Sequence, residues 1–73
     1  MRKRDELTNP AGCMARARDD EMTFVLLGRD EAAPAAIRAW VAERIRLGKN
    51  RPGDPKMLDA EETARTMEVE RWT

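Results

Sequence analysis

Hydrophobic side chains recur at a helical spacing over residues 34–47, and this is the clearest pattern in the chain. Pro34 suits the first turn of a helix, where its missing N–H does no harm, and Gly48 stands where helices are often capped. Four apolar residues lie three or four positions apart and so share one face: Ile37, Trp40, Val41 and Ile45. The pattern predicts the longest helix of the protein here.

Two further helices are predicted on either side of it. The first begins at Asn9-Pro10, presents a short apolar face, and ends near Arg18, before an acidic cluster that would be unfavourable at a helix C-terminus. The last has a narrow stripe of small side chains and ends near Arg71. Its start has two readings, either at Asp54-Pro55 or at a capping box formed by Asp59 and Glu62. Residues 1–8 show no period and are expected to form a flexible arm, which leaves residues 9–73 as one small helical domain.

One segment departs from the helical pattern and is expected to be extended. Its residues are apolar in succession, as in a strand that is covered on both faces: Thr23, Phe24, Val25, Leu26 and Leu27. A single strand leaves its backbone groups unpaired, so we expect it to pair with the same strand of a second copy across a twofold axis. The rival reading is a monomer whose extended segment is covered but unpaired. The expected fold is therefore mainly α, formally α+β, with about three helices and a short strand between the first two.

Length and charge set limits on this fold. A chain of 73 residues forms at most one domain and has a thin core. The formal net charge is +0, but residues 32–52 carry a net +4 and residues 53–73 a net −3. We expect these two segments to pack side by side and neutralise each other.

Composition excludes several kinds of chemistry. The chain has no histidine, no serine and a single cysteine, Cys13, so a Ser–His or Cys–His nucleophile, an intramolecular disulfide and a cysteine–histidine metal site cannot be built. No glycine-rich phosphate loop occurs. We therefore expect no enzyme activity and no cofactor or metal. The lone cysteine and the absence of a secretory signal or membrane span favour the cytoplasm.

The middle of the chain resembles a recurring pattern in small, uncharacterised phage and prophage proteins. The residues that carry it are Asp20, Glu21, Phe24, Val25, Leu26, Asp30, Ala33, Pro34, Arg38 and Trp40. This resemblance implies a phage or mobile-element origin and no reaction. Many small phage proteins bind a host component, and inhibitors of bacterial defence complexes, of the anti-CRISPR type, have a similar size and a similar lack of chemistry. We therefore expect a protein-interaction module.

Arginine and tryptophan are enriched in binding hot spots, which marks the candidate contact residues: Arg38, Trp40, Arg44, Arg46 and Arg51. Arg44 falls within the apolar arc of the longest helix, so its side chain should snorkel, pair with a tail glutamate, or face a partner. The alternative function is a nucleic-acid-binding accessory protein that uses the basic segment 38–51 and the N-terminal arm.

Overall fold

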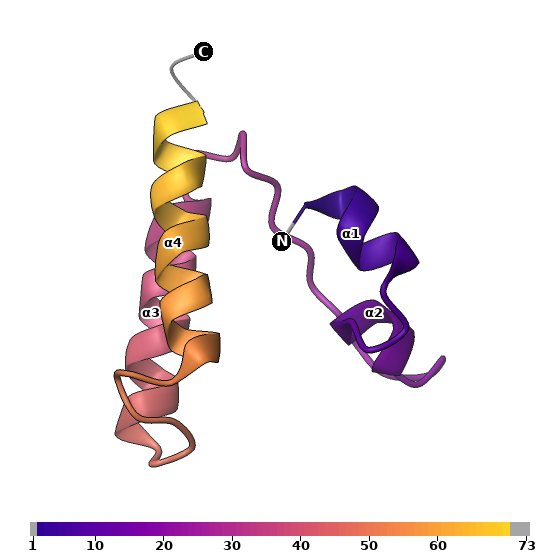
Figure 1. Cartoon of the computed structure of the whole chain (residues 1–73), viewed down its shortest axis with the longest axis horizontal. Helices are drawn as coiled ribbons and strands as arrows, with labels where there is room; N and C mark the ends of the chain where they lie inside the picture. Colours follow the sequence, from indigo (N-terminus) through magenta and orange to yellow (C-terminus); the bar gives the residue numbers. More distant parts are fainter. Residues whose placement is uncertain (1, 71–73) are drawn as a thin grey trace.

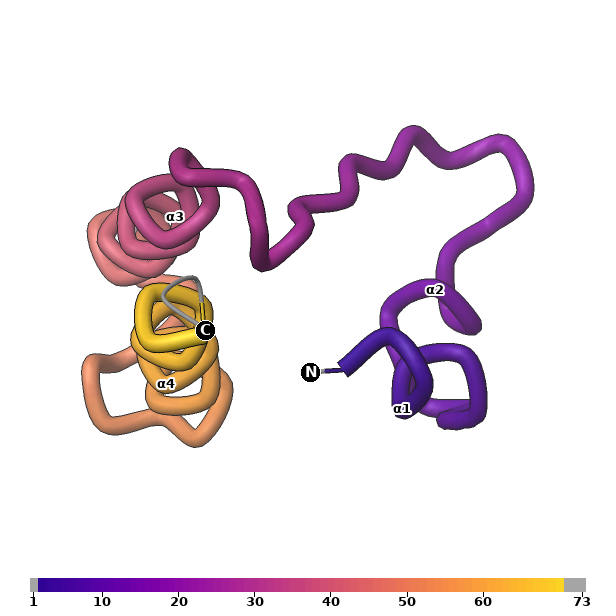
Figure 2. The backbone as a smooth tube through the Cα atoms, turned by 90° about the horizontal axis from the view of Figure 1, so that it is seen from above, coloured from indigo at the N-terminus to yellow at the C-terminus, as the bar shows by residue number. Residues whose placement is uncertain are grey.

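A computed structural model describes residues 2–70 as four α-helices in two groups (Figure 1). They are α1 (Lys3–Thr8), α2 (Cys13–Arg16), α3 (Ala33–Arg46) and α4 (Pro55–Glu70). Helices α3 and α4 lie side by side as a hairpin, and α1 and α2 form a smaller body that an extended stretch of chain joins to it (Figure 2). The mainly helical class is confirmed, with one helix more than expected and with no strand among residues 2–70.

Helix α3 has the bounds that its apolar period predicts to within one residue. Pro34 occupies the first turn, and the helix ends where Gly48 adopts a φ of 73°. The N–H of Gly48 donates to the carbonyl of Ile45 at 3.0 Å, and that of Lys49 to the carbonyl of Arg44 at 3.0 Å. A left-handed glycine thus satisfies carbonyls at the end of the helix, as in common C-terminal caps.

Helix α4 begins at the Asp54-Pro55 pair. The carbonyl of Asp54 accepts hydrogen bonds from the N–H groups of Met57 at 2.9 Å and Leu58 at 3.0 Å. Pro55 needs no acceptor in this first turn. Of the two starts that the sequence allows, the structure therefore has the earlier one, and Asp59 lies inside the helix.

The core lies between α3 and α4 and is small. The hydrophobic side chains buried there are Ala33, Val41, Met57 and Ala64, and Pro34 in the first turn of α3 is buried as well. The alanines let the two helices approach closely, and Met57 fills the space between them because its unbranched side chain adapts to irregular gaps. An ion pair between Arg38 and Glu68 joins the same two helices at the surface. This pair agrees with the expected packing of the basic segment against the acidic one.

The body formed by α1 and α2 is held by polar contacts. The Glu6 carboxylate accepts a hydrogen bond from the backbone N–H of Met14 at 2.6 Å, which ties α1 to α2. The helix predicted from Asn9-Pro10 to near Arg18 corresponds to α2, which has only four residues. It ends early because the backbone is already extended at Ala17. Residues 3–8 are helical, and the division into a flexible arm and a domain stays a prediction.

The expected strand is not seen. Residues 22–26 form no backbone hydrogen bond with any other described residue, and helices do not cover the segment as expected. Met22 is 94% exposed, Phe24 87% and Val25 65%. The physical reason is that residues 2–70 contain no second strand to pair with this segment. Residues 22–27 instead bridge the two helical groups as an extended segment, which we call the strap (Figure 2).

Replacing Gly48 by alanine should destabilise the protein by about 1 kcal/mol, since an L-residue is strained at its positive φ. Gly53→Ala is the matched control, because neither glycine has an atom within 4 Å of the added carbon and only Gly48 has a positive φ. Urea unfolding followed by circular dichroism measures both. Equal stability of the two variants would contradict a left-handed cap.

Truncation of Met57 to alanine should cost about 2–3 kcal/mol, because its side chain is only 1% exposed in the core. The neighbouring variant Leu58→Ala, which removes a 56% exposed side chain from the same helix, should stay within about 0.5 kcal/mol of the original protein. The same urea titrations compare the two. A larger loss for the Leu58 variant would place the core on the wrong face of α4.

Candidate functional site

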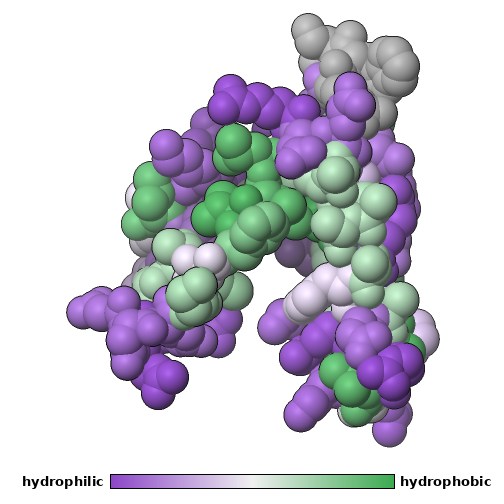
Figure 3. All heavy atoms as spheres, turned by 180° about the vertical axis from the view of Figure 1, so that it is seen from behind, coloured by the Kyte–Doolittle hydropathy of each residue, from purple (hydrophilic) through white to green (hydrophobic). Residues whose placement is uncertain are grey.

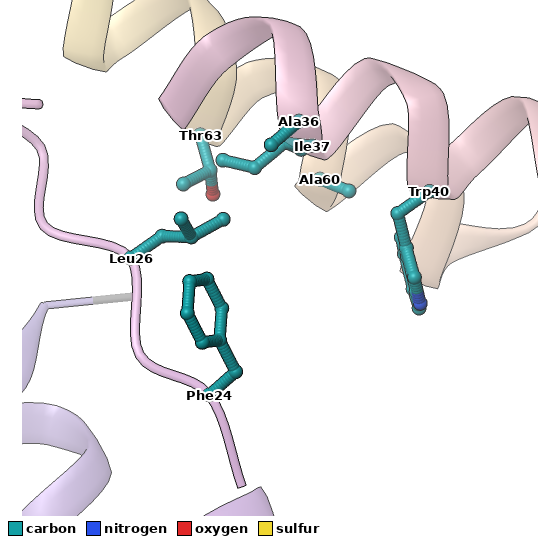
Figure 4. Close-up of a pocket in the computed structure, with 7 residues that line it drawn as sticks. All are labelled: Phe24, Leu26, Ala36, Ile37, Trp40, Ala60 and Thr63. Atoms are coloured by element: carbon teal, nitrogen blue, oxygen red, sulfur yellow. The ribbon is translucent and has the colours of Figure 1, made fainter. Parts of the chain in front are cut away.

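One hollow lies where the strap meets the helical hairpin, and we call it the α3–α4 groove. Phe24 and Leu26 of the strap point toward the hairpin, while Trp40 projects from α3 further along the groove (Figure 4). The groove has a volume of about 410 Å³ and is lined by Phe24, Leu26, Ala36, Ile37, Trp40, Ala60 and Thr63. Six of these seven side chains are apolar, so the groove suits an apolar side chain of a partner.

Two cations lie over the Trp40 ring at the end of this groove. The guanidinium carbon of Arg44 is 5.8 Å from the ring centroid, and the Lys56 ammonium is 5.7 Å from it. Such contacts are worth about 0.5–1 kcal/mol at exposed sites. The ring remains 41% exposed. Trp40 is therefore positioned by its neighbours while part of its surface stays open to solvent.

Arg44 is half-buried and anchors the loop between α3 and α4. Its Nε donates to Oδ1 of Asn50 at 2.7 Å, and Nδ2 of Asn50 donates to Oδ2 of Asp54 at 3.1 Å. The same Asp54 oxygen accepts the backbone N–H of Arg51 at 2.9 Å. The Arg51 N–H first, and the Asn50 amide second, hold the pKa of Asp54 below its ordinary value. This chain of bonds fixes Arg44 beside Trp40.

The other predicted contact residues lie outside the groove. Arg38 is paired with Glu68 across the hairpin, and Arg46 is paired with Glu43 on α3, with its Nε 2.9 Å from the Glu43 carboxylate. Arg46 lowers the pKa of Glu43. Among the five candidates, the structure thus brings together Trp40 and Arg44. The contact roles of all five stay predictions.

A second and larger hollow, the central cleft, separates the body of α1 and α2 from α4. Its volume is about 910 Å³. Seen from behind, the molecule is hollowed between two hydrophilic parts, with apolar residues gathered where they meet (Figure 3). The apolar lining comes from Leu7, Met14, Val25, Leu26, Leu27 and Met67. Leu26 of the strap and Thr63 of α4 line both hollows, so the strap and this part of α4 lie between them.

Sequence reasoning missed this cleft because its residues come from segments with no common period. Leu7 stands alone in the residues expected to form an arm, and Met14 belongs to a helix that is shorter than its pattern predicts. An ion pair between Arg2 and Glu70 connects the two sides, and the hydrogen bond from Arg2 lowers the pKa of Glu70. These two residues are far apart in sequence, and no local pattern signals their contact.

The described part of the chain offers few other sites. No group of three or more cysteine, aspartate or glutamate side chains within residues 2–70 is arranged to hold a metal ion. None of the helices described is long and apolar enough to cross a membrane. No protein-family model, curated protein or solved structure matches this chain. Function must therefore be argued from the two hollows themselves.

The lowered pKa of Asp54 predicts a pH dependence of stability. A carboxylate whose folded-state pKa is depressed stabilises the fold above its unfolded pKa, and this contribution is lost as the pH falls through the folded value. Unfolding free energy should therefore fall as the pH drops below about 4, and Asp54→Asn should make that fall shallower. Glu43 and Glu70, whose pKa values are also lowered, contribute part of the remaining pH dependence of the unfolding free energy.

Urea titrations at a series of pH values test this. Asp59→Asn is the control, since that exposed side chain makes no hydrogen bond with a described residue, and it should keep the original profile. If the unfolding free energy of the Asp54 variant fell with pH as steeply as that of the original protein, the Asn50–Asp54 contact would not stabilise the loop.

Proposed function

We propose that this protein is a non-enzymatic interaction module that binds a partner protein through the strap and the α3–α4 groove. The observation that supports this most directly is the area of its surface. The accessible surface is 6221 Å², whereas a compact monomer of the same mass exposes about 4,600 Å². The excess of roughly 1,600 Å² exceeds the 800 Å² or so that each partner buries in a standard interface.

The shape of the chain supports the same proposal. Its radius of gyration is 13.0 Å, and a compact domain of this length has one of about 11 Å. The excess surface includes large apolar side chains of the strap, of which Phe24 is 87% exposed. Large apolar side chains exposed in this number are typical of interaction sites. The half-exposed Trp40 with Arg44 beside it supplies the residue types that carry binding energy in many interfaces.

Contacts of the basic segment argue against the nucleic-acid alternative. Arg38 and Arg46, two of its five cations, are already paired with the carboxylates of Glu68 and Glu43. Each ion pair would have to break before its arginine could contact a phosphate, which lowers the free energy gained by binding a nucleic acid. A protein partner needs no such exchange, because the groove is apolar.

Two finer parts of the proposal rest on the sequence. The resemblance to small phage proteins supports a phage or mobile-element origin and a partner in a bacterial defence complex, as for inhibitors of the anti-CRISPR type. The backbone of residues 23–26, which forms no hydrogen bond with another described residue, supports pairing of the segment 23–27 with a second copy in a homodimer, since extended segments readily add to a strand. Both are hypotheses that the recovered complex would test.

The first experiment is a pull-down with the tagged full-length protein from bacterial lysate, with and without nuclease, followed by mass spectrometry. A discrete protein partner should survive nuclease. With that partner purified, Phe24→Ser should weaken binding at least about tenfold, as expected for a hot-spot side chain. Titration calorimetry measures the affinity, and light scattering reports the oligomeric state.

Met22→Ser is the matched control, because Met22 belongs to the same strap and is more exposed than Phe24 but does not line the groove. It should bind within about twofold of the original protein, well inside the tenfold that corresponds to 1.4 kcal/mol. Loss of all recovery after nuclease, together with loss in an Arg46→Glu/Arg51→Glu variant, would replace the proposal with nucleic-acid binding.

A further inference from the structure

The central cleft has the form of a site for a helix. Residues of α1 and α4 line its two sides, and the strap supplies its apolar floor through Val25, Leu26 and Leu27. Leu7, Met14 and Met67 extend the apolar lining toward both sides. Amphipathic helices commonly bind with their apolar face in such a groove, and their polar face then contacts the rim.

The lining of the cleft is acidic. Five carboxylate side chains and two cations contribute to it, which gives a net charge of −3: Asp5, Glu6, Asp59, Glu62 and Glu70 against Arg2 and Lys3. Some of these charges are already engaged, because Glu6 accepts the Met14 N–H and Glu70 is paired with Arg2. Asp59 and Glu62 form no side-chain hydrogen bond or ion pair with another described residue. They lie three residues apart on α4 and so share the face that borders the cleft.

We propose that the central cleft binds a basic amphipathic helix of a partner protein, an inference that rests on the proposed interaction function and names the chemistry of the partner. Apolar side chains of that helix contact the strap and Met67, while its lysines or arginines lie against Asp59 and Glu62. Opposite charges on the two surfaces favour this class of partner and disfavour an acidic one.

A second copy of the chain fits the cleft less well. In a twofold contact each cleft would face the other, so two acidic linings would be brought together. The chain's own basic surface is partly engaged, since Arg38 and Arg46 are paired with Glu68 and Glu43. Charge complementarity therefore points to a different protein.

Fluorescence anisotropy with the full-length protein tests the inference. The probe is a fluorescein-labelled helical peptide of leucine and lysine, with leucine at every third or fourth position. About 15 residues make a helix of roughly 22 Å, close to the length of α4. We expect saturable binding that weakens as salt rises. A peptide with glutamate in place of every lysine should not bind.

Two variants locate the binding. Asp59→Lys/Glu62→Lys should weaken binding of the lysine peptide on the order of tenfold or more, and Val25→Ser should weaken it through the apolar floor. Asp19→Lys/Asp20→Lys makes the same change in net charge outside the cleft and should leave the affinity within about twofold, a loss small beside the tenfold expected in the cleft. Circular dichroism checks that each variant is folded.

The possible results separate the two proposals. Equal weakening by both charge reversals, binding of the glutamate peptide, or a cleft closed by a second copy that excludes the lysine peptide would each overturn the inference. If the peptide fails to bind while a protein partner still depends on Phe24, the inference fails and the proposed function stands. If recovery from lysate depends on nucleic acid, the proposed function fails as well.

Discussion

The packing of α3 against α4 around Met57 is the interaction on which the rest of this structure depends. Val41, Ala33 and Ala64 are buried with Met57, and no comparable core occurs elsewhere in the described residues. Hydrophobic burial is the main favourable term in the free energy of folding. Most of the stability of the described fold therefore comes from this hairpin. The loop bonds of Arg44, Asn50 and Asp54 and the glycine cap at Gly48 set its turn.

The small size of that core explains the open shape. The apolar side chains of the strap are not buried in the hairpin, and α1 and α2 are too short to form a second core. The strap is therefore left as part of the wall between two hollows, with Phe24 on one side and Val25 on the other. The same constraint that limits stability creates the surfaces for which we propose a binding role.

Prediction from the sequence succeeded where one local pattern was strong. The period through Ile37 and Val41, with Pro34 and Gly48 at the ends, located α3 within a residue. For α4 the sequence allowed two starts, and Asp54-Pro55 is the one that the structure has. It failed at residues 23–27, because apolar succession indicates burial but cannot supply a neighbouring strand. It also did not reveal the central cleft, whose lining comes from residues as distant as Arg2 and Glu70.

By itself the sequence determined the helical class, the limits of α3, and the lack of histidine and serine for common nucleophilic chemistry. These properties follow from local spacing and from composition. Only the tertiary structure decided that the strap is exposed, that Arg44 and Lys56 both lie over the Trp40 ring, and that acidic and apolar residues share a cleft. The reason is that these features depend on where distant segments meet, and this is set by how much apolar surface the α3–α4 core can bury.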